Sequence, residues 1–366
     1  MTSPEVPDSA AAGPAQAQAQ AALADAPWLA VSIEQLRRSR EAHRFPPALL
    51  IHDQRGAGGE ALAQFAVRLL LCRSSPAPCG ECRDCRQLAA GQHPDFYAVS
   101  PTEDSRQIRI EQIRELSEQL SMTSHGGAGA LALITPADAL NANAANALLK
   151  TLEEPRNGVT LLLVTTQPSR LPATILSRCQ RLRVAIPSRE ASLAWLARWG
   201  GPQPWEAVLE VIGNAPFEAL RLDAPEVAQL GEQTRSWLGE LLAGRGDVAR
   251  TAESWGRAES LELRLICLEN WLTSRIDGAV RRGGQARELR SGAHLSEAGS
   301  DLNMARLLLA LDALHELRRL RLSSINRPLA LELLLRQLAA GTRRTDELLE
   351  ALPGEHDQGS DFQIRR

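Results

Sequence analysis

Lysine is nearly absent from this sequence: Lys150 is the only one, and arginine supplies the other fixed positive charges. The 41 basic residues are balanced by 44 acidic residues, which gives a formal net charge of −3. This balance excludes a global basic field that would recruit nucleic acid. Any contact with DNA must therefore come from a local patch or from partner proteins.

Long apolar runs are missing as well. No stretch approaches the length of about 20 apolar residues that a membrane-spanning helix needs. No charged segment followed by an apolar segment opens the sequence, so a secretory signal is not expected. These absences predict a cytoplasmic protein.

Composition changes along the chain predict five regions, and 366 residues are enough for two or three domains with real cores. Residues 1–26 and 345–366 are polar or low in complexity and are expected to be disordered tails. Residues 27–186 alternate strand and helix patterns, which predicts an α/β domain with a parallel sheet. Three short helices are expected in residues 187–224, and longer helices in residues 225–344.

Residues 225–344 contain two long apolar stripes at helical spacing, at 261–280 and 302–322. Between them, residues 283–300 are rich in Gly and Arg and are expected to form a loop. The pattern predicts a bundle of helices.

The stretch from residue 141 to residue 186 carries the clearest α/β pattern. Its first part has apolar residues spaced for one face of a helix, which Pro155 ends. Val159–Thr166 is a continuous run of β-branched residues and leucines, typical of a strand that is buried on both faces. A further β pattern at Arg181–Ile186 completes what a parallel sheet requires.

A glycine-rich turn follows the short apolar run at residues 48–52. A phosphate-binding P-loop reads G-x-x-x-x-G-K-[ST] at such a place. The corresponding positions here are Asp53, Gly56, Gly58, Gly59 and Glu60. Asp53 replaces the first glycine, Gly59 replaces the lysine, and Glu60 replaces the hydroxyl residue that would bind Mg²⁺. Because two carboxylates would repel phosphates, the loop is predicted to be a plain turn that binds ATP poorly, with weak nucleotide binding as the alternative.

Two motifs at a fixed separation carry a resemblance to a known family. Asn146–Pro155 reads NALLKTLEEP and Ile175–Cys179 reads ILSRC, and both resemble the bacterial DNA polymerase III clamp-loader subunits, which are AAA+ proteins. The resemblance implies a RecA-like parallel sheet domain, then a small helical lid domain at 187–224. It also implies a helical collar domain at 225–344 that holds the subunits of the complex together.

The resemblance exposes a second loss. In active ATPases of this family, the strand at residues 130–134 ends in an Asp-Glu pair that binds Mg²⁺ and activates water. Here it ends in Thr135-Pro136, and Asp138 stands at the wrong offset. Two losses at one site imply an ATPase fold that no longer hydrolyses ATP.

A cysteine cluster lies between these two degenerate motifs. Cys72, Cys79, Cys82 and Cys85 follow the spacing C-x6-C-x2-C-x2-C. Four thiolates suit tetrahedral zinc, and in a cytosolic protein a metal is favoured over disulfides. An iron–sulfur cluster is an alternative, although Cys85 is followed by Arg86-Gln87 and not by the rest of a ferredoxin pattern. Free or redox-active thiols are the third possibility, and zinc is the predicted cofactor.

Three further residues could be mistaken for ligands. Cys179 and Cys267 stand in apolar surroundings where a small buried thiol is the usual role. His93 is expected to be a turn residue, because the four cysteines already fill a tetrahedral shell.

The cysteine module and the lost motifs together narrow the resemblance. Such a module occurs in delta prime and in gamma/tau subunits of the family, but the loss of the lysine and of the acidic pair is similar to delta prime alone. A delta prime-type subunit implies gamma/tau and delta partners through the collar, with the sliding clamp and primed DNA within the complex. That complex serves the DNA polymerase III holoenzyme, a DNA-directed DNA polymerase and thus a nucleotidyltransferase, in DNA replication. The alternatives are an active gamma/tau-like ATPase and a zinc-stabilised DNA-binding domain.

Arg178 is the candidate catalytic residue. In the family the arginine of this motif acts as an arginine finger on the ATP of a neighbouring subunit, and the match here extends to Ser177 and Cys179. Guanidinium stays charged and can bind γ-phosphate oxygens as charge develops. The alternative is a structural arginine that pairs with Glu153 or Glu154.

Arg106 and Arg109 lie near the start of a helix expected at 109–122 and are candidates for contact with a DNA backbone. The alternative is an ordinary solvated face.

Overall fold

A computed structural model of the chain describes residues 21–102, 105–121, 129–243, 245–289, 304–320 and 326–340. The chain divides into two compact units, each with its own internal contacts. The first comprises Met1–Leu209 with Asn214–Ala224, and the second comprises Glu210–Gly213 with Pro225–Arg366. None of the helices in the described ranges is both long and apolar enough to cross a membrane.

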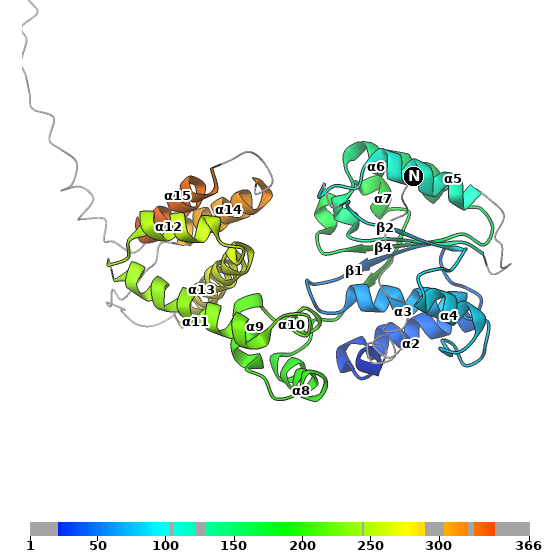
Figure 1. The fold of residues 1–366 in the computed structure, drawn as a ribbon, viewed down its shortest axis with the longest axis horizontal. Helices are drawn as coiled ribbons and strands as arrows, with labels where there is room; N and C mark the ends of the chain where they lie inside the picture. The colour runs from blue at the N-terminus through cyan, green and yellow to red at the C-terminus, as the bar shows by residue number, and fades with distance from the viewer. Residues whose placement is uncertain are drawn as a thin grey trace, which may run out of the picture. The chain divides into compact units, whose positions relative to one another are not determined.

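A five-stranded parallel sheet forms the centre of the first unit, in the order β2-β3-β4-β1-β5 (Figure 1). The strands are β1 (Ala48–His52), β2 (Phe96–Val99), β3 (Leu131–Ile134), β4 (Thr160–Thr165) and β5 (Gln180–Arg183). The two strands β1 and β4 pair in the middle with Leu50 opposite Leu163, and both leucines are buried. The predicted α/β class with a parallel sheet is confirmed.

Helices cover both faces of this sheet. The first unit contains η1 (Pro27–Leu29), α2 (Ala30–Glu41), α3 (Gly59–Leu71), α4 (Arg83–Ala89), α5 (Ile110–Ser121), η2 (Ala137–Ala139), α6 (Ala142–Glu153), η3 (Pro168–Arg170), α7 (Ala173–Leu176), α8 (Arg189–Gly200) and α10 (Pro216–Ala219). Figure 1 shows α5, α6 and α7 on one face, and α2, α3 and α4 on the other. Leu148 and Leu152 of α6 pack with Leu161 and Leu163 of β4 in one hydrophobic core.

The helix α6 begins and ends where its sequence requires. The Asn141 side chain accepts a hydrogen bond from the Ala144 N–H at 2.8 Å, which caps the helix N-terminus. Its last residue, Glu153, is separated from Pro155 only by Glu154. The LLKTLEEP motif therefore follows one helix up to Glu153, and Glu154 is the C-cap.

The folded part begins earlier than predicted, because residues 21–26 belong to it and not to a tail. Residues 21–24 are helical, and Leu23 and Ala26 are buried. The indole Nε1 of Trp195 in α8 donates to the Ala22 carbonyl at 2.9 Å. This long-range contact is invisible in an Ala- and Gln-rich composition. Residues 1–20 lie outside the described residues.

The second unit is helical. Its elements are α11 (Ala224–Leu242), α12 (Val248–Arg257), α13 (Leu261–Leu289), α14 (Met304–Leu320) and α15 (Arg327–Ala340), and α9 (Trp205–Ile212) ends in it. Leucines of these helices form one core, with Leu265, Leu314 and Leu335 fully buried. The predicted bundle of helices is therefore present.

The loop expected at 283–300 is wrong in its first part, since α13 continues to Leu289. Gln285, Ala286, Arg287, Glu288 and Leu289 are good helix formers. These residues favour the helix despite the glycines at 283 and 284, each of which lowers helix stability by about 1 kcal/mol relative to alanine. Residues 290–303 and the tail predicted at 345–366 lie outside the described residues.

Candidate functional site

The degenerate loop between β1 and α3 contains a buried carboxylate, that of Asp53. Asp53 directly follows β1, and its side chain is buried. The backbone N–H groups of Gly59, Gln54 and Gly58 lie close enough to this carboxylate to favour its charged form, while its Oδ1 has no hydrogen-bond partner within the described residues. Burial raises the pKa of Asp53 to about 6, although these N–H groups act in the opposite direction. In an active P-loop, backbone N–H groups at the start of the helix hold phosphate.

Other parts of the first unit close over the same loop. The Trp28 Nε1 donates to the Ala57 carbonyl at 2.7 Å, and the Phe217 N–H donates to the Gly56 carbonyl at 3.0 Å. Arg55 forms two hydrogen bonds with the Glu218 carboxylate, at 2.7 and 2.9 Å. The loop is therefore held by a residue before the sheet and by residues of α10, which pair with the Gly56 and Ala57 carbonyls and with Arg55.

The loop glycines leave no room for larger residues. A Cβ added at Gly56 would lie 2.5 Å from Ala215 Cβ, and one at Gly58 would lie 2.6 Å from Phe217 Cε2. A Cβ at Gly59, where a P-loop has its lysine, would lie 2.4 Å from Asp53 Cβ. Restoring a lysine there would thus require Asp53 to leave its buried position.

The second degenerate motif also has a structural use. Strand β3 ends at Ile134, and the Thr135 N–H continues the pairing to the Val99 carbonyl at 3.0 Å. The Asp138 Oδ1 accepts hydrogen bonds from Thr165 Oγ1 at 2.6 Å and from the Thr166 N–H at 3.2 Å. The carboxylate nearest to the lost Asp-Glu pair is therefore used to fix the end of β4.

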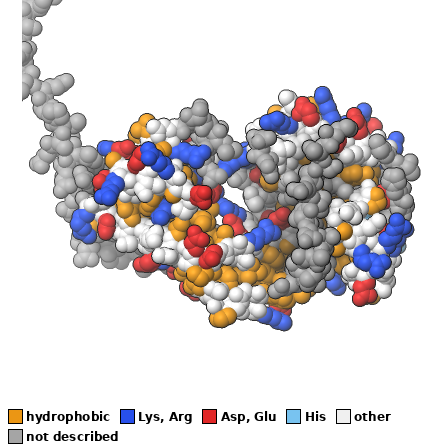
Figure 2. All heavy atoms as spheres, in the orientation of Figure 1, with side chains coloured by type: hydrophobic (Ala, Val, Ile, Leu, Met, Phe, Trp, Pro, Cys, Tyr) orange, Lys and Arg blue, Asp and Glu red, His pale blue; other side chains and the backbone are white. Residues whose placement is uncertain are grey.

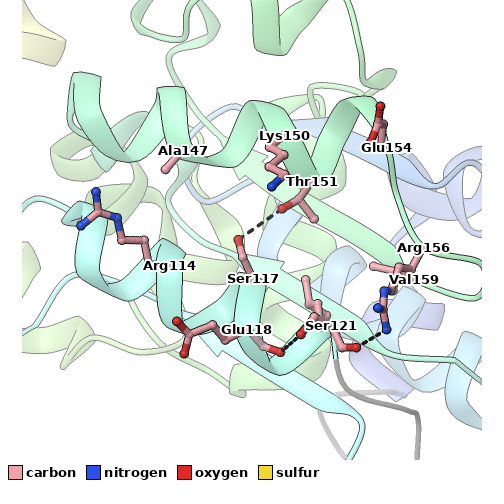
Figure 3. Close-up of a pocket in the computed structure, with 11 residues that line it drawn as sticks. Arg114, Ser117, Glu118, Ser121, Ala147, Lys150, Thr151, Glu154, Arg156 and Val159 are labelled. Atoms are coloured by element: carbon pink, nitrogen blue, oxygen red, sulfur yellow. Dashed lines mark hydrogen bonds between the residues drawn. The ribbon is translucent and has the colours of Figure 1, made fainter.

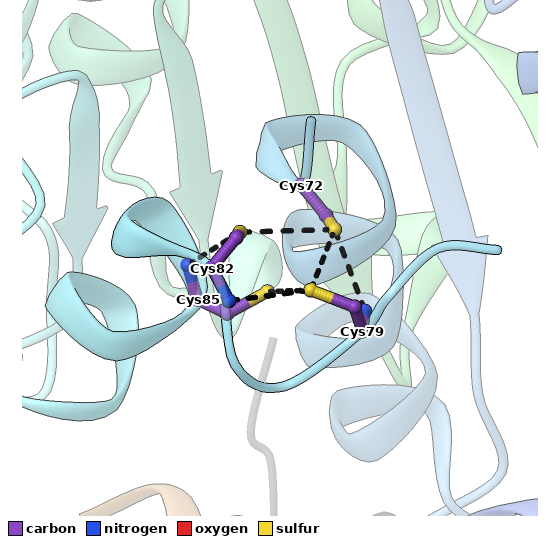
Figure 4. Close-up of side chains that lie close together, drawn as sticks. All are labelled: Cys72, Cys79, Cys82 and Cys85. Carbon is purple, nitrogen blue, oxygen red and sulfur yellow. Dashed lines mark hydrogen bonds between the residues drawn. The ribbon is translucent and has the colours of Figure 1, made fainter. Parts of the chain in front are cut away.

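The four cysteines converge as predicted (Figure 4). Cys72 follows α3, and Cys82 caps the N-terminus of α4. The four sulfur atoms all lie within 4.8 Å of one another. Neighbouring sulfurs are separated by 3.6 to 4.0 Å. A tetrahedral ion with metal–sulfur bonds of about 2.3 Å would place its sulfurs about 3.8 Å apart. The donor set and its spacing therefore fit a metal ion.

Backbone N–H groups face three of the four sulfurs. The Sγ atoms of Cys72, Cys79 and Cys82 each accept an N–H, at 3.3 to 3.4 Å. The Ser74 side chain, together with the N–H groups of Glu81 and Cys82, lowers the pKa of Cys79 to about 6. Burial raises the pKa of Cys85, so this thiol needs the positive charge of a metal to ionise near neutral pH.

The other candidate metal ligands, His93, Cys179 and Cys267, do not join the cluster. The His93 Nδ1 accepts the Asp95 N–H at 3.2 Å, and Nε2 lies 3.4 Å from Asp84 Oδ1. Cys179 and Cys267 are buried far along the chain, and burial raises the pKa of each to about 11. All three fit the structural roles expected for them.

Arg178 lies just after α7, where the short helix brings it to the end of α6. Its guanidinium pairs with the Glu153 carboxylate at 2.5 Å and donates to the Thr174 carbonyl at 3.0 Å. The structural pairing that the sequence offered as an alternative is therefore present, with Glu153 as the partner. The Arg178 side chain is 34% exposed and that of Glu153 is 48% exposed. An exposed pair of this kind stabilises a fold by only about 0–1 kcal/mol, so the guanidinium can exchange partners.

The residues on either side of Arg178 are fixed locally. Ser177 ends α7, and its hydroxyl donates to the Thr174 carbonyl at 3.1 Å. Cys179 is buried in the hydrophobic core that α6 and α7 form with the sheet. Ser177 and Cys179 thus fix the backbone on either side of Arg178, whose side chain stays at the surface.

Arg106 and Arg109 are exposed in the segment before α5. The Arg109 N–H donates to Gln112 Oε1 at 3.0 Å. Their contact with DNA remains a prediction.

One surface feature was missed by the sequence analysis. A pocket of about 500 Å³ lies beside α5 and α6, and Figure 3 shows Arg114, Lys150 and Arg156 along it with Glu118 and Glu154. The Ser117 and Thr151 hydroxyls are hydrogen-bonded across it at 3.2 Å. Lys150, the only lysine in the chain, is the one feature of the sequence that could have pointed to this pocket. The pocket is lined by side chains of both charges, which favours no single ligand.

Comparison with known proteins agrees with this geometry. A family model described as "DNA polymerase III, delta subunit" matches residues 29–187. DNA polymerase III subunit delta prime of Pseudomonas aeruginosa is 36% identical over 329 residues, which cover 86% of this chain and 97% of that protein. The delta prime subunit of Yersinia pestis is 35% identical over 70% of this chain and 76% of its own length. That of Escherichia coli is 38% identical over 47% of this chain and 52% of its own. This chain therefore belongs to the delta prime family of DNA polymerase III subunits.

Proposed function

We propose that this delta prime subunit works in the DNA polymerase III clamp loader without hydrolysing ATP itself and with only weak binding of ATP. The observation that carries the proposal is the buried Asp53 carboxylate, which lies beside the backbone N–H groups that would face a phosphate in a working P-loop. The hydrogen bonds from Trp28 and Phe217 to the Ala57 and Gly56 carbonyls support it, because they fix the loop in its present shape. Its part in replication is then assembly and the support of neighbouring ATPase subunits.

We further propose that Arg178 acts in trans as an arginine finger. Support comes from its exposed position and from a weak ion pair that a triphosphate could replace. A chain whose own loop cannot hold ATP has no use for such an arginine at its own site.

The proposed partners are the gamma/tau and delta subunits, bound through the helices of residues 225–344. Exposed leucines on α14 and α15 support an interface there: Leu308, Leu309, Leu329 and Leu333 are each 46% exposed or more. The sliding clamp and primed DNA are met within that complex. We place this activity in the cytoplasm, where bacterial DNA is replicated.

The proposed cofactor is zinc. Four thiolates at tetrahedral spacing favour zinc, and the cysteine pattern lacks the continuation typical of ferredoxins. The ion would be held by Cys72, Cys79, Cys82 and Cys85 and would crosslink the end of α3 to α4.

Assembly can be measured directly. When the chain is mixed with the gamma/tau and delta subunits of the same organism, native mass spectrometry should show one complex that contains a single copy of it. Omission of the chain should abolish loading of the sliding clamp on primed DNA. A chain that stays monomeric in the mixture, or a loader that works equally well without it, would contradict the proposed role.

A further inference from the structure

The carboxylate of Asp84 lies between two segments that the cysteine cluster also joins. Its Oδ2 is 3.2 Å from Arg73 Nε, and its Oδ1 is 3.4 Å from His93 Nε2. Arg73 directly follows Cys72, and Asp84 directly precedes Cys85. The ion pair therefore links one metal-ligating segment to the other without using a sulfur atom.

The contact between Asp84 and His93 is sheltered from solvent, whereas Arg73 is exposed. The side chain of Asp84 is 14% exposed and that of His93 only 3%. Because His93 Nδ1 accepts the Asp95 N–H, a neutral imidazole carries its proton on Nε2, the atom that faces Asp84. Within the described residues, His93 Nε2 has no hydrogen-bond partner. The Asp84 carboxylate is thus an acceptor that faces this buried N–H at 3.4 Å and also pairs with an arginine.

We propose that Asp84 is a positioning residue for the metal module. With Arg73 and His93 it forms a clip that holds Cys72 and the Cys82–Cys85 turn near ligand spacing, independently of the metal. A bound metal then loses fewer contacts when the module flexes, and its release is slowed. The clip also ties the module to the chain that enters β2, since His93 stands three residues before that strand. This inference rests on the proposed metal site and not on the proposed role in the clamp loader.

Electrostatics alone would give the opposite sign. Four thiolates around a divalent ion carry a net negative charge, so a nearby carboxylate repels them. If Coulomb repulsion decided the outcome, removal of the Asp84 charge would slow metal release. If the clip decides it, the same change speeds release.

The test compares Asp84→Asn with Glu81→Gln in the full chain. Glu81 lies in the same turn and is exposed, so its replacement removes one negative charge beside the cluster without breaking the clip. The measurement is the rate of zinc transfer to a chromogenic chelator at neutral pH, with the zinc content of each protein determined first. Asp84→Asn should release zinc about 10-fold faster than the unmodified chain, as is typical for partners outside the ligand shell. Glu81→Gln should stay within about twofold, since it keeps every clip contact.

Arg73→Gln provides a second, milder route, because the Arg73 side chain is 53% exposed and its loss threatens folding less. It should also speed release, and combining it with Asp84→Asn should add little, as expected for residues that act through one contact. If a zinc-loaded Asp84→Asn protein releases metal no faster than Glu81→Gln, the clip is wrong while the metal site stands. A wild-type chain without zinc overturns the metal assignment and the clip together.

Discussion

Replacing Arg178 with alanine should slow ATP hydrolysis at the one adjoining site of the reconstituted clamp loader by on the order of 10³-fold, the lower end of the effect of arginine fingers in GTPases. The physical reason is the loss of a fixed positive charge where negative charge develops on the γ-phosphate. Total turnover should fall less, because other subunits keep their own sites. Single-turnover hydrolysis and clamp loading on primed DNA are the measurements.

Two matched variants separate the trans role from the structural one. Glu153→Gln breaks the ion pair seen here but keeps the arginine, and Glu154→Gln removes a neighbouring charge from the same turn. Both should hydrolyse and load at nearly normal rates if Arg178 acts on a neighbour. If Glu153→Gln is as slow as Arg178→Ala, the pair itself is what matters. A reconstituted Arg178→Ala complex that loads clamps normally would rule the finger out.

Replacing Cys82 with serine should remove the metal and unfold the module around it. Cys82 both offers a thiolate and caps α4 by accepting the Cys85 N–H, so its loss affects two contacts. Zinc in small Cys-rich peptides binds with about 10–16 kcal/mol of apparent free energy, all of it coupled to folding. Here the sheet and its core should persist, so the expected result is a lower melting temperature with loss of the metal. Metal analysis and thermal unfolding are the measurements.

Cys267→Ser is the control for that experiment. Cys267 is a buried thiol in the second unit, and its replacement should leave the metal content unchanged. The unmodified chain should contain about one zinc per molecule, as a four-thiolate site implies. A preparation that contains iron would favour the iron–sulfur alternative, and one that contains no metal would favour free thiols.

The sequence predicted those features that depend on local pattern. Continuous apolar runs predicted strands such as β4, because a strand covered on both faces needs apolar side chains at every position. Cysteine spacing predicted the cluster, because its ligands come from one short segment. The absent lysine at position 59 predicted a loop unsuited to ATP.

Features built from distant segments could not be predicted in this way. Nothing in the loop sequence indicates that Trp28 will bind the Ala57 carbonyl or that Phe217 will lie against Gly58, since one precedes the sheet and the other follows it. The choice of Glu153 over Glu154 as the partner of Arg178 depends on where α6 ends relative to α7. Composition also gave no sign of the helical turn at residues 21–24, which receives a hydrogen bond from Trp195 far along the chain.

Nucleotide binding to the isolated chain tests the central claim most directly. Labelled ATP should bind weakly and should not be hydrolysed, because the buried Asp53 carboxylate lies in the loop that would hold phosphate and would repel it. Gly59→Lys should not restore hydrolysis, since the lysine would collide with Asp53 and Thr135-Pro136 supplies no metal-binding carboxylate. Hydrolysis by the unmodified chain, free of other subunits, would contradict the account.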